Sequence, residues 1–310
     1  MNIAIIDLGT NTFNLLIAEL TDASYKSLHA TKDFVQLGKG GINKQQITDE
    51  AFKRGLKSLT RFKKIAQNYS CTHVLAIATS AIRNAENGQY FCQQVYDATG
   101  ITIEIIDGNR EADLIYLGAK QAVSMQQGTH LIMDVGGGST EFIICNHQQV
   151  FWKQSFEVGV ARLFERFHHS DPISSEEISN IITYLHTVLT PLLEKVKEYN
   201  IEKLIGCSGA FSSFAAIILN QQDSEDEIDG VKNYEFDFNE FKATHKLLLE
   251  TSLNERLKIV GLLPQRAPMI VVGSILVNFI LENITIKKFE MSKFALKEGA
   301  IFDFINKVTM

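Results

Sequence analysis

Two short segments place a carboxylate and small hydrogen-bonding residues in the same order. "IIDLGTNTFNLLI" (5–17) and "IMDVGGGSTEFII" (132–144) align without a gap, so that Asp7 matches Asp134 and Asn14 matches Glu141. Each has an apolar run, Asp-x-Gly, a small polar loop and a second apolar run. Glycines let a backbone approach a ligand closely, and loop N–H groups and hydroxyls donate to phosphate oxygens. The pattern therefore predicts phosphate binding at each loop.

The residues after each loop identify its type. A Walker loop needs G-x-x-x-x-G-K-[ST] and then a helix. Neither copy has the lysine, and the continuations "FNLLIAEL" and "TEFIIC" have no helical start signal, so neither loop is a Walker loop. A dinucleotide-binding motif also needs a helix after its glycines and is excluded for the same reason. We expect two β-hairpin turns in a duplicated fold, which could bind a phosphate chain from both sides. One such turn alone is equally compatible with a turn that binds no ligand. An aspartate beside bound phosphate is repelled unless a cation lies between them, which indicates Mg²⁺.

The elements that position these loops read as an α/β fold. Short apolar strand-like runs at 72–80, 101–106, 130–135 and 202–207 alternate with amphipathic segments. We expect helices at 49–66, capped by Thr48, and from the capping box Ser174/Glu177 to about 197, kinked or divided at Pro191. The segment 233–238 alternates like an edge strand, and the acidic segment 221–230 reads as an exposed loop. The run "APMIVVGSILVNFIL" from 267 is shorter than the ~18–20 residues of a membrane span, so we expect a buried strand and helix there.

Bulk composition excludes several classes of protein. The 310 residues suit two domains, and a net charge of −6 argues against general nucleic-acid binding. Asp7 interrupts the N-terminal apolar run too early for a signal peptide. The four cysteines form no C-x-x-C pair, which argues against a zinc or disulfide framework and favours a reducing cytoplasm. One side of helix 49–66 is basic and carries Arg54, Lys57, Arg61 and Lys64. Such a side is typical of a solvated helix face, and it could also guide a polyanion.

Beyond the loops, several motifs carry a family resemblance. "DLGTNT" (7–12), "ATSAIRNAEN" (78–87), "IIDGNREADLIYLGA" (105–119) and "DVGGGSTE" (134–141) occur in this order, with looser matches at 158–167 and 261–270. With these motifs the chain resembles the exopolyphosphatase and guanosine pentaphosphatase (Ppx/GppA) family of the actin-like ATPase superfamily, in its short form.

The resemblance implies two actin-like (ribonuclease H-like) α/β domains with the active site in the cleft between them. Domain I would span 1–122, with the last helix (297–310) packing back on it, and domain II would span 123–296. It also implies a cytoplasmic, Mg²⁺-dependent homodimer that acts on polyphosphate or guanosine pentaphosphate, with no nucleic-acid or membrane partner.

The resemblance further assigns roles to residues. Glu111 matches the catalytic base, a carboxylate that can orient a water and accept its proton, and Arg83 matches an arginine near the phosphates. The implied phosphate-binding set is Gly9, Thr10, Asn11, Thr12, Gly136, Gly137, Gly138, Ser139 and Arg162. The implied metal set is Asp134, Glu141 and Asp7, and the place where actin-like relatives hold adenosine is occupied by Gly206, Ser208 and Gly209.

The sequence departs from the family pattern at four positions. Arg110 replaces the first Glu of E-E-A, Pro268 replaces an Asp, Lys297 replaces an Arg, and Asn14 replaces a basic or histidine residue. We expect a Mg²⁺-dependent phosphoanhydride hydrolase, with short polyphosphate slightly ahead of guanosine pentaphosphate as substrate. Two alternatives remain: an ATP-dependent phosphotransferase or ATPase of the actin-like superfamily, and a guanosine-polyphosphate-binding regulator with little turnover.

Overall fold

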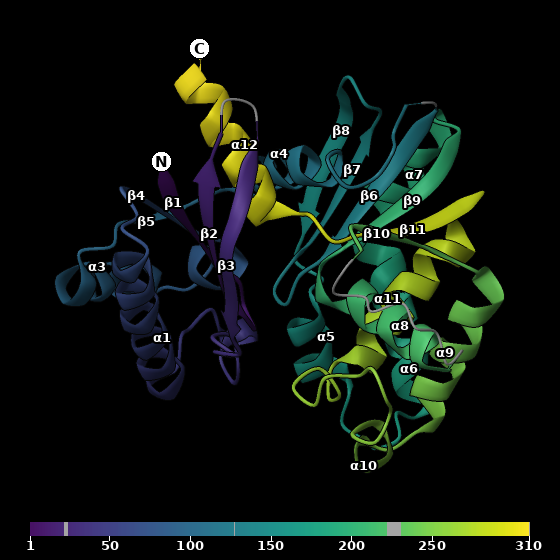
Figure 1. The fold of residues 1–310 in the computed structure, drawn as a ribbon. Helices are drawn as coiled ribbons and strands as arrows, with labels where there is room; N and C mark the ends of the chain where they lie inside the picture. Colours follow the sequence, from purple (N-terminus) through teal and green to yellow (C-terminus); the bar gives the residue numbers. More distant parts are fainter. Residues whose placement is uncertain (22–23, 127, 222–230, 310) are drawn as a thin grey trace. The chain divides into compact units, whose positions relative to one another are not determined.

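The computed structural model describes residues 1–21, 24–126, 128–221 and 231–309, and its chain divides into two compact units (Figure 1). The first unit comprises Met1–Gly118 and Leu296–Met310, and the second comprises Ala119–Ala295. The acidic segment expected as a loop at 221–230 lies outside the described residues except for Gln221.

The first unit is a five-stranded mixed sheet with helices on both faces. The strand order is β3-β2-β1-β4-β5, in which β2 runs antiparallel to its neighbours and β1, β4 and β5 are parallel. Helices α1 and α3 cover one face, and α4 and α12 cover the other (Figure 1). The elements are β1 (Asn2–Leu8), β2 (Phe13–Leu20), β3 (Tyr25–Asp33), η1 (Ile42–Lys44), α1 (Asp49–Asn68), β4 (His73–Ala78), α2 (Ser80–Arg83), α3 (Gly88–Thr99), β5 (Ile103–Ile105), α4 (Gly108–Ala119) and α12 (Leu296–Thr309).

The second unit repeats this topology and adds one strand at the edge. Its order is β10-β11-β9-β6-β7-β8, so β8-β7-β6-β9-β11 corresponds to β3-β2-β1-β4-β5, and β10 pairs antiparallel outside β11. The expected duplication is therefore confirmed as a structural repeat of the ribonuclease H-like arrangement. The strands are β6 (Thr129–Val135), β7 (Thr140–Cys145), β8 (Val150–Phe156), β9 (Ile201–Cys207), β10 (Asn233–Phe236) and β11 (Lys288–Ser292).

The helices of the second unit surround one central apolar helix. Helix α11 (Ile270–Asn283) is apolar all round and packs against α5, α6, α8 and α9. The expected strand in the run from 267 is wrong, because Ile270–Asn283 forms a single helix that four other helices bury. The other helices are α5 (Val160–Phe167), α6 (Ser175–Val188), α7 (Thr190–Lys195), η2 (Val196–Glu198), α8 (Ser208–Gln221), α9 (Phe238–Glu250) and α10 (Leu253–Arg256).

Local sequence signals set several helix ends. The Thr48 hydroxyl accepts a hydrogen bond from the N–H of Ala51 and caps α1, and Ser174 and Glu177 form the expected capping box of α6. Pro191 lies in the first turn of α7 and separates it from α6, because proline cannot continue a helix but fits its start. None of the described helices is both long and apolar enough to cross a membrane.

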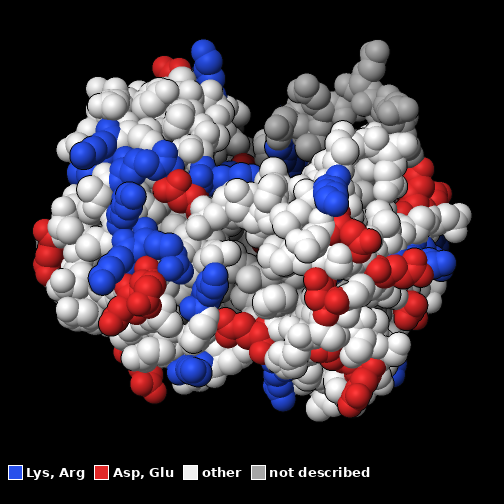
Figure 2. All heavy atoms as spheres, turned by 90° about the horizontal axis from the view of Figure 1, so that it is seen from below, with Lys and Arg blue, Asp and Glu red and all other residues white. Residues whose placement is uncertain are grey.

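Helix α1 turns its apolar stripe to the sheet and its basic residues outward. Leu59, Phe62 and Ala66 are buried, whereas Lys57 and Lys64 are exposed. In Figure 2, basic side chains gather in one area of the unit that carries this helix. Arg54 and Arg61 are not part of a free basic face, because both hold main-chain or carboxylate oxygens of residues 33–36.

Candidate functional site

The first glycine-rich loop is the tight turn between β1 and β2. The N–H of Gly9 donates to the carbonyl of Thr12 over 3.1 Å and closes the turn. A Cβ on Gly9 would lie 3.0 Å from that same carbonyl oxygen, so any other residue there would push the turn open by a few tenths of an ångström. The carbonyls of Thr10 and Asn11 accept from the N–H groups of Gly38 (3.1 Å) and Gln36 (2.9 Å). Since a peptide's carbonyl and N–H point in opposite directions, the held carbonyls turn the loop's N–H groups to the other side.

The second loop joins β6 and β7 and is held in the same way by a different element. The carbonyls of Gly136, Gly137 and Gly138 accept from the N–H groups of Val160 (3.0 Å), Ala161 (2.8 Å) and Gly159 (3.3 Å), at the start of α5. As in the first turn, a Cβ on the leading glycine, Gly136, would come within 2.8 Å of a carbonyl, that of Ser139. Both loops therefore fix their carbonyls against the protein, which suits amide binding of an anion on the opposite side.

Two of the hydroxyl-bearing residues in the loops are buried. Thr10 and Ser139 are each only 3% exposed as whole residues.

Two acidic side chains of the second unit stand side by side. Asp134 on β6 and Glu141 on β7 are register partners, so their side chains point to the same face of the sheet. Both are buried, and the Ser155 hydroxyl donates to Glu141 Oε1 over 2.6 Å. Neighbouring carboxylates repel unless a proton or a cation lies between them.

The donor chemistry of this pair fits a magnesium ion. Mg²⁺ is commonly bound by one or two carboxylates, with water and substrate phosphates filling its other positions. Within the described chain, no group of three or more His, Cys, Asp or Glu side chains is arranged to hold a metal.

The first unit has an acid–amide pair at the equivalent place. Asp7 and Asn14 are register partners, and Asn14 Nδ2 donates to Asp7 Oδ2 over 3.0 Å. Burial raises the pKa of Asp7 to about 6 from an ordinary 3.8, while the bond from Asn14 and the charge of Lys297 lower it. Asn14, which departs from the family pattern, thus has a local role, because it donates a hydrogen bond to the Asp7 carboxylate.

Arg83 and Glu111 form an ion pair in the first unit. Arg83 is the last residue of the short helix α2 directly after β4, and Glu111 is in the first turn of α4. Arg83 Nη1 donates to Glu111 Oε2 over 2.8 Å and to the carbonyl of Ile106 over 3.0 Å. Both side chains are mostly buried, with 16% and 9% exposed. The fold thus brings the predicted base and the predicted phosphate-binding arginine together, 28 residues apart in sequence.

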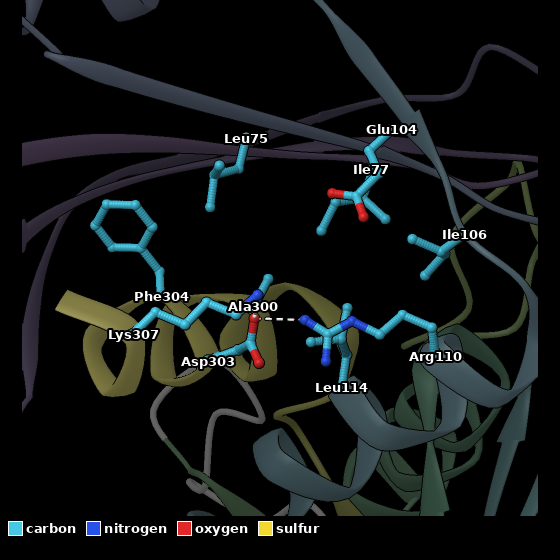
Figure 3. Close-up of a pocket in the computed structure, with 10 residues that line it drawn as sticks. All are labelled: Leu75, Ile77, Glu104, Ile106, Arg110, Leu114, Ala300, Asp303, Phe304 and Lys307. Carbon is cyan, nitrogen blue, oxygen red and sulfur yellow. Dashed lines mark hydrogen bonds and ion pairs between the residues drawn. The ribbon is translucent and has the colours of Figure 1, made fainter. Parts of the chain in front are cut away.

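The neighbouring Arg110 points elsewhere. Its guanidinium pairs with Asp303 of α12, which also pairs with Lys307 (Figure 3). These three side chains line a cavity of about 230 Å³, whose walls include Leu75 and Ile77. The replacement of the family glutamate by Arg110 therefore has a structural reason, because this position binds α4 to α12 and does not face Glu111.

The segment at the end of β9 is explained by packing. The Phe211 ring fills the space in which a Cβ of Gly206 would lie, at 2.1 Å, and the Arg266 guanidinium lies 2.8 Å from a Cβ on Gly209. Ser208 has a φ of 79°, and its hydroxyl donates to the carbonyl of Val135 over 2.7 Å. These glycines therefore give no separate support for a nucleotide site.

Arg162 contacts the protein itself. Its Nε donates to the carbonyl of Gly138 over 2.8 Å and its Nη2 pairs with Glu157 over 2.6 Å. We infer that it fixes the second turn, whereas the sequence suggested a direct phosphate contact.

Sequence reasoning missed the elements that hold the turns. Residues 36–38 and Gly159 were not assigned a role, yet each lies against a turn. A Cβ on Gly159 would lie 2.3 Å from Gly137. The only available signals were the glycine-rich "QLGKGG" (36–41) and the glycine in "VGVAR" (158–162), which local patterns cannot place in space.

Comparison with known proteins gives a consistent family. The model of the Ppx/GppA phosphatase family matches residues 16–308. A guanosine-5'-triphosphate,3'-diphosphate pyrophosphatase of Photobacterium profundum is 27% identical over 305 residues, which cover 98% of this chain and 59% of that protein. The chain thus spans somewhat more than half the length of the pyrophosphatases it matches.

Solved structures match the whole fold. The crystal structure of an exopolyphosphatase from Cytophaga hutchinsonii is 37% identical, with a TM-score of 0.96 and coverage of 99% of this chain and 98% of that one. An Aquifex aeolicus Ppx/GppA protein, 24% identical with a TM-score of 0.82 and coverage of 100% and 99%, shares the fold. The match of the family model to nearly the whole chain, and the 37% identity to a structure covered almost completely, show that this chain belongs to the Ppx/GppA phosphatase family.

Proposed function

We propose that this chain is a Mg²⁺-dependent phosphoanhydride hydrolase that releases terminal phosphate from polyphosphate or from guanosine pentaphosphate. The observation that carries the proposal is the pair of hairpin turns, in each of which N–H groups of another segment hold the turn's carbonyls. Two turns of one design, in a member of this family, support binding of a phosphate chain.

In the proposed reaction, Glu111 orients a water molecule and accepts its proton as the water attacks the terminal phosphorus. The bond from that phosphorus to the bridging oxygen breaks, and the products are phosphate and the shortened substrate. Arg83 offsets negative charge on the phosphate oxygens. A magnesium ion held by Asp134 and Glu141 would neutralise further charge on the substrate.

The Arg83–Glu111 ion pair suggests how phosphate binding could lead to hydrolysis. One nitrogen of Arg83 holds both Glu111 and the carbonyl of Ile106. A phosphate that draws the guanidinium toward itself would weaken its bond to Glu111 and leave that carboxylate available as a base.

The decisive experiment compares two carboxylate-to-amide variants of the purified chain. With Mg²⁺ and either substrate, Glu111→Gln should release phosphate ~10²–10⁴-fold more slowly than the wild type, as loss of a general base predicts. Glu104→Gln is the matched control, because Glu104 is an exposed carboxylate on β5 of the same unit. No release from either substrate by the wild type, or undiminished release by Glu111→Gln, would refute the proposal.

The same assay distinguishes the alternatives. ATP turnover with transfer to an acceptor would favour a phosphotransferase, and nucleotide affinity with negligible turnover would favour a regulator. A series of polyphosphate chain lengths tests the preference for short chains. We further propose a cytoplasmic homodimer, which light scattering tests; the four free cysteines are consistent with a reducing compartment.

A further inference from the structure

Residues 33–38, which we call the clasp, connect helix α1 to the first phosphate-binding turn. On one side, the N–H groups of Gln36 and Gly38 donate to the turn's carbonyls at Asn11 and Thr10, over 2.9 and 3.1 Å. A Cβ on Gly38 would lie 2.6 Å from the Thr10 methyl carbon, so the contact is close as well as hydrogen-bonded.

On its other side, the clasp is held by three side chains of α1. Arg54 Nε donates to the carbonyl of Val35 over 2.7 Å, and Arg54 Nη2 donates to the carbonyl of Gln36 over 2.9 Å. Four and seven residues further along, Ser58 donates to Asp33 over 2.7 Å and Arg61 forms two hydrogen bonds with the same carboxylate. This spacing places all three side chains on one face of the helix.

The backbone of the clasp needs this support. Gln36 has a φ of 50°, a left-handed conformation that costs a residue with a side chain ~1 kcal/mol or more. A guanidinium presents two N–H donors in a rigid fork, which suits two successive carbonyls and which the single ammonium of lysine cannot reproduce. Arg54 has no carboxylate partner in the described chain, so its hydrogen bonds to these carbonyls are its main interaction.

We propose that Arg54 is a positioning residue for the first phosphate-binding turn. Its guanidinium holds two successive carbonyls of the clasp, those of Val35 and Gln36, and the Gln36 N–H in turn holds the carbonyl of Asn11, which orients the peptides of the turn that would bind phosphate. This role rests on the proposed function only in that the turn binds phosphate. Arg54 therefore acts through main-chain geometry and differs from Lys57, which is exposed on the same helix.

Hydrogen exchange tests the contact without relying on catalysis. Arg54→Met removes the guanidinium and keeps the apolar stem, and Lys57→Met removes the same charge from the same helix. We expect the amides of Gln36 and Gly38 to exchange at least ~10-fold faster in Arg54→Met than in the wild type. Lys57→Met should exchange like the wild type, and the peptides of β6, β7 and β9 should be unchanged in both variants. If the amides of Gln36 and Gly38 exchange as slowly in Arg54→Met as in Lys57→Met, the proposal is overturned.

Inorganic tripolyphosphate then tests the effect on the turn. It should slow exchange of the amides at 10–12 in the wild type and in Lys57→Met, and much less in Arg54→Met. A merely structural arginine would leave this ligand-dependent protection intact, and that result would contradict the proposed role. Absence of protection in the wild type would count against phosphate binding at this turn, and with it against the positioning role.

Kinetics distinguish positioning from attraction of a polyanion. We expect kcat/KM for phosphate release to fall ~10–100-fold in Arg54→Met, equally at low and high ionic strength. Arg54→Lys, a milder change that guards against misfolding, should recover only part of the loss despite its full charge. The proposal is wrong, and Arg54 attracts substrate by its charge, under either of two results. One is that Arg54→Lys has the same kcat/KM as the wild type. The other is that Lys57→Met loses as much kcat/KM as Arg54→Met and that high salt removes the difference of both from the wild type.

Discussion

Gly159 offers a sharp test of how the second turn is held. It caps the start of α5 with φ −70° and ψ 159°, a conformation open to any residue, so alanine would meet no backbone strain. The only obstacle is space, since a Cβ would lie 2.3 Å from the carbonyl carbon and oxygen of Gly137 and 2.5 Å from the carbonyl carbon of Gly138.

The size of the effect follows from these distances. Ordinary contact begins at 3.4 Å, so the backbone must separate by about 1.1 Å (3.4 − 2.3). That separation strains the hydrogen bonds from Gly159, Val160 and Ala161 to the turn. Overpacking of this kind costs ~1–3 kcal/mol of stability, and a displacement of ~1 Å at a binding element lowers activity ~10²-fold.

The assay compares Gly159→Ala with Gly273→Ala in urea unfolding and in phosphate release. A Cβ on Gly273 would sit at an ordinary 3.4 Å from Val160, within helix α11, so alanine there should leave activity unchanged and stabilise by ~0.5–1 kcal/mol. The reasoning fails if Gly159→Ala matches the wild type in both measurements, or if the two variants lose activity equally.

Three further outcomes follow from the described contacts. Glu177 accepts hydrogen bonds from the N–H groups of His169, Ser170 and Ser174, which together with the Ser170 hydroxyl hold its pKa at about 2, against an ordinary 4.5. The contribution of Glu177 to stability is therefore complete above pH 4.5 and is lost as the pH falls toward 2. In urea titrations, Glu177→Ala should lower the free energy of unfolding by ~1 kcal/mol at neutral pH but not at pH 2. The matched variant Glu176→Ala, at an exposed position, should have little effect. Arg256 is 1% exposed and donates to the carbonyl of the buried Ala267, whereas its ion-pair partner Asp171 is exposed. Arg256→Met leaves that carbonyl without its donor and should lower the free energy of unfolding by ~1–3 kcal/mol in urea, whereas the exposed Lys258→Met should have no effect; equal stability of the two variants would contradict this role. Chelation should abolish phosphate release, and added Mg²⁺ should restore it. Asp134→Asn should raise the Mg²⁺ concentration that gives the half-maximal rate by ~10-fold or more. Full activity in the presence of a chelator would exclude the proposed metal.

The sequence by itself determined the features that depend on neighbouring residues. The two Asp-x-Gly turns, the helix caps at Thr48 and Ser174, and the break at Pro191 all follow from local hydrogen bonding and backbone sterics. The aligned copies also predicted the repeated topology, because the same order of strand, turn and strand must fold in the same way twice. The strand expected in the run from 267 failed because the buried face of a helix and a short buried strand have the same apolar composition.

Only the tertiary structure decided which side chains serve the turns. Arg54 looked like one member of a basic stripe, yet it binds carbonyls 18 and 19 residues earlier in the chain. Arg110 and Glu111 are adjacent in sequence, but the turn of helix α4 directs one to Asp303 of α12 and the other to Arg83. Periodicity gives the face of a helix on which a residue lies; what that face meets depends on the packing of segments far apart in the sequence.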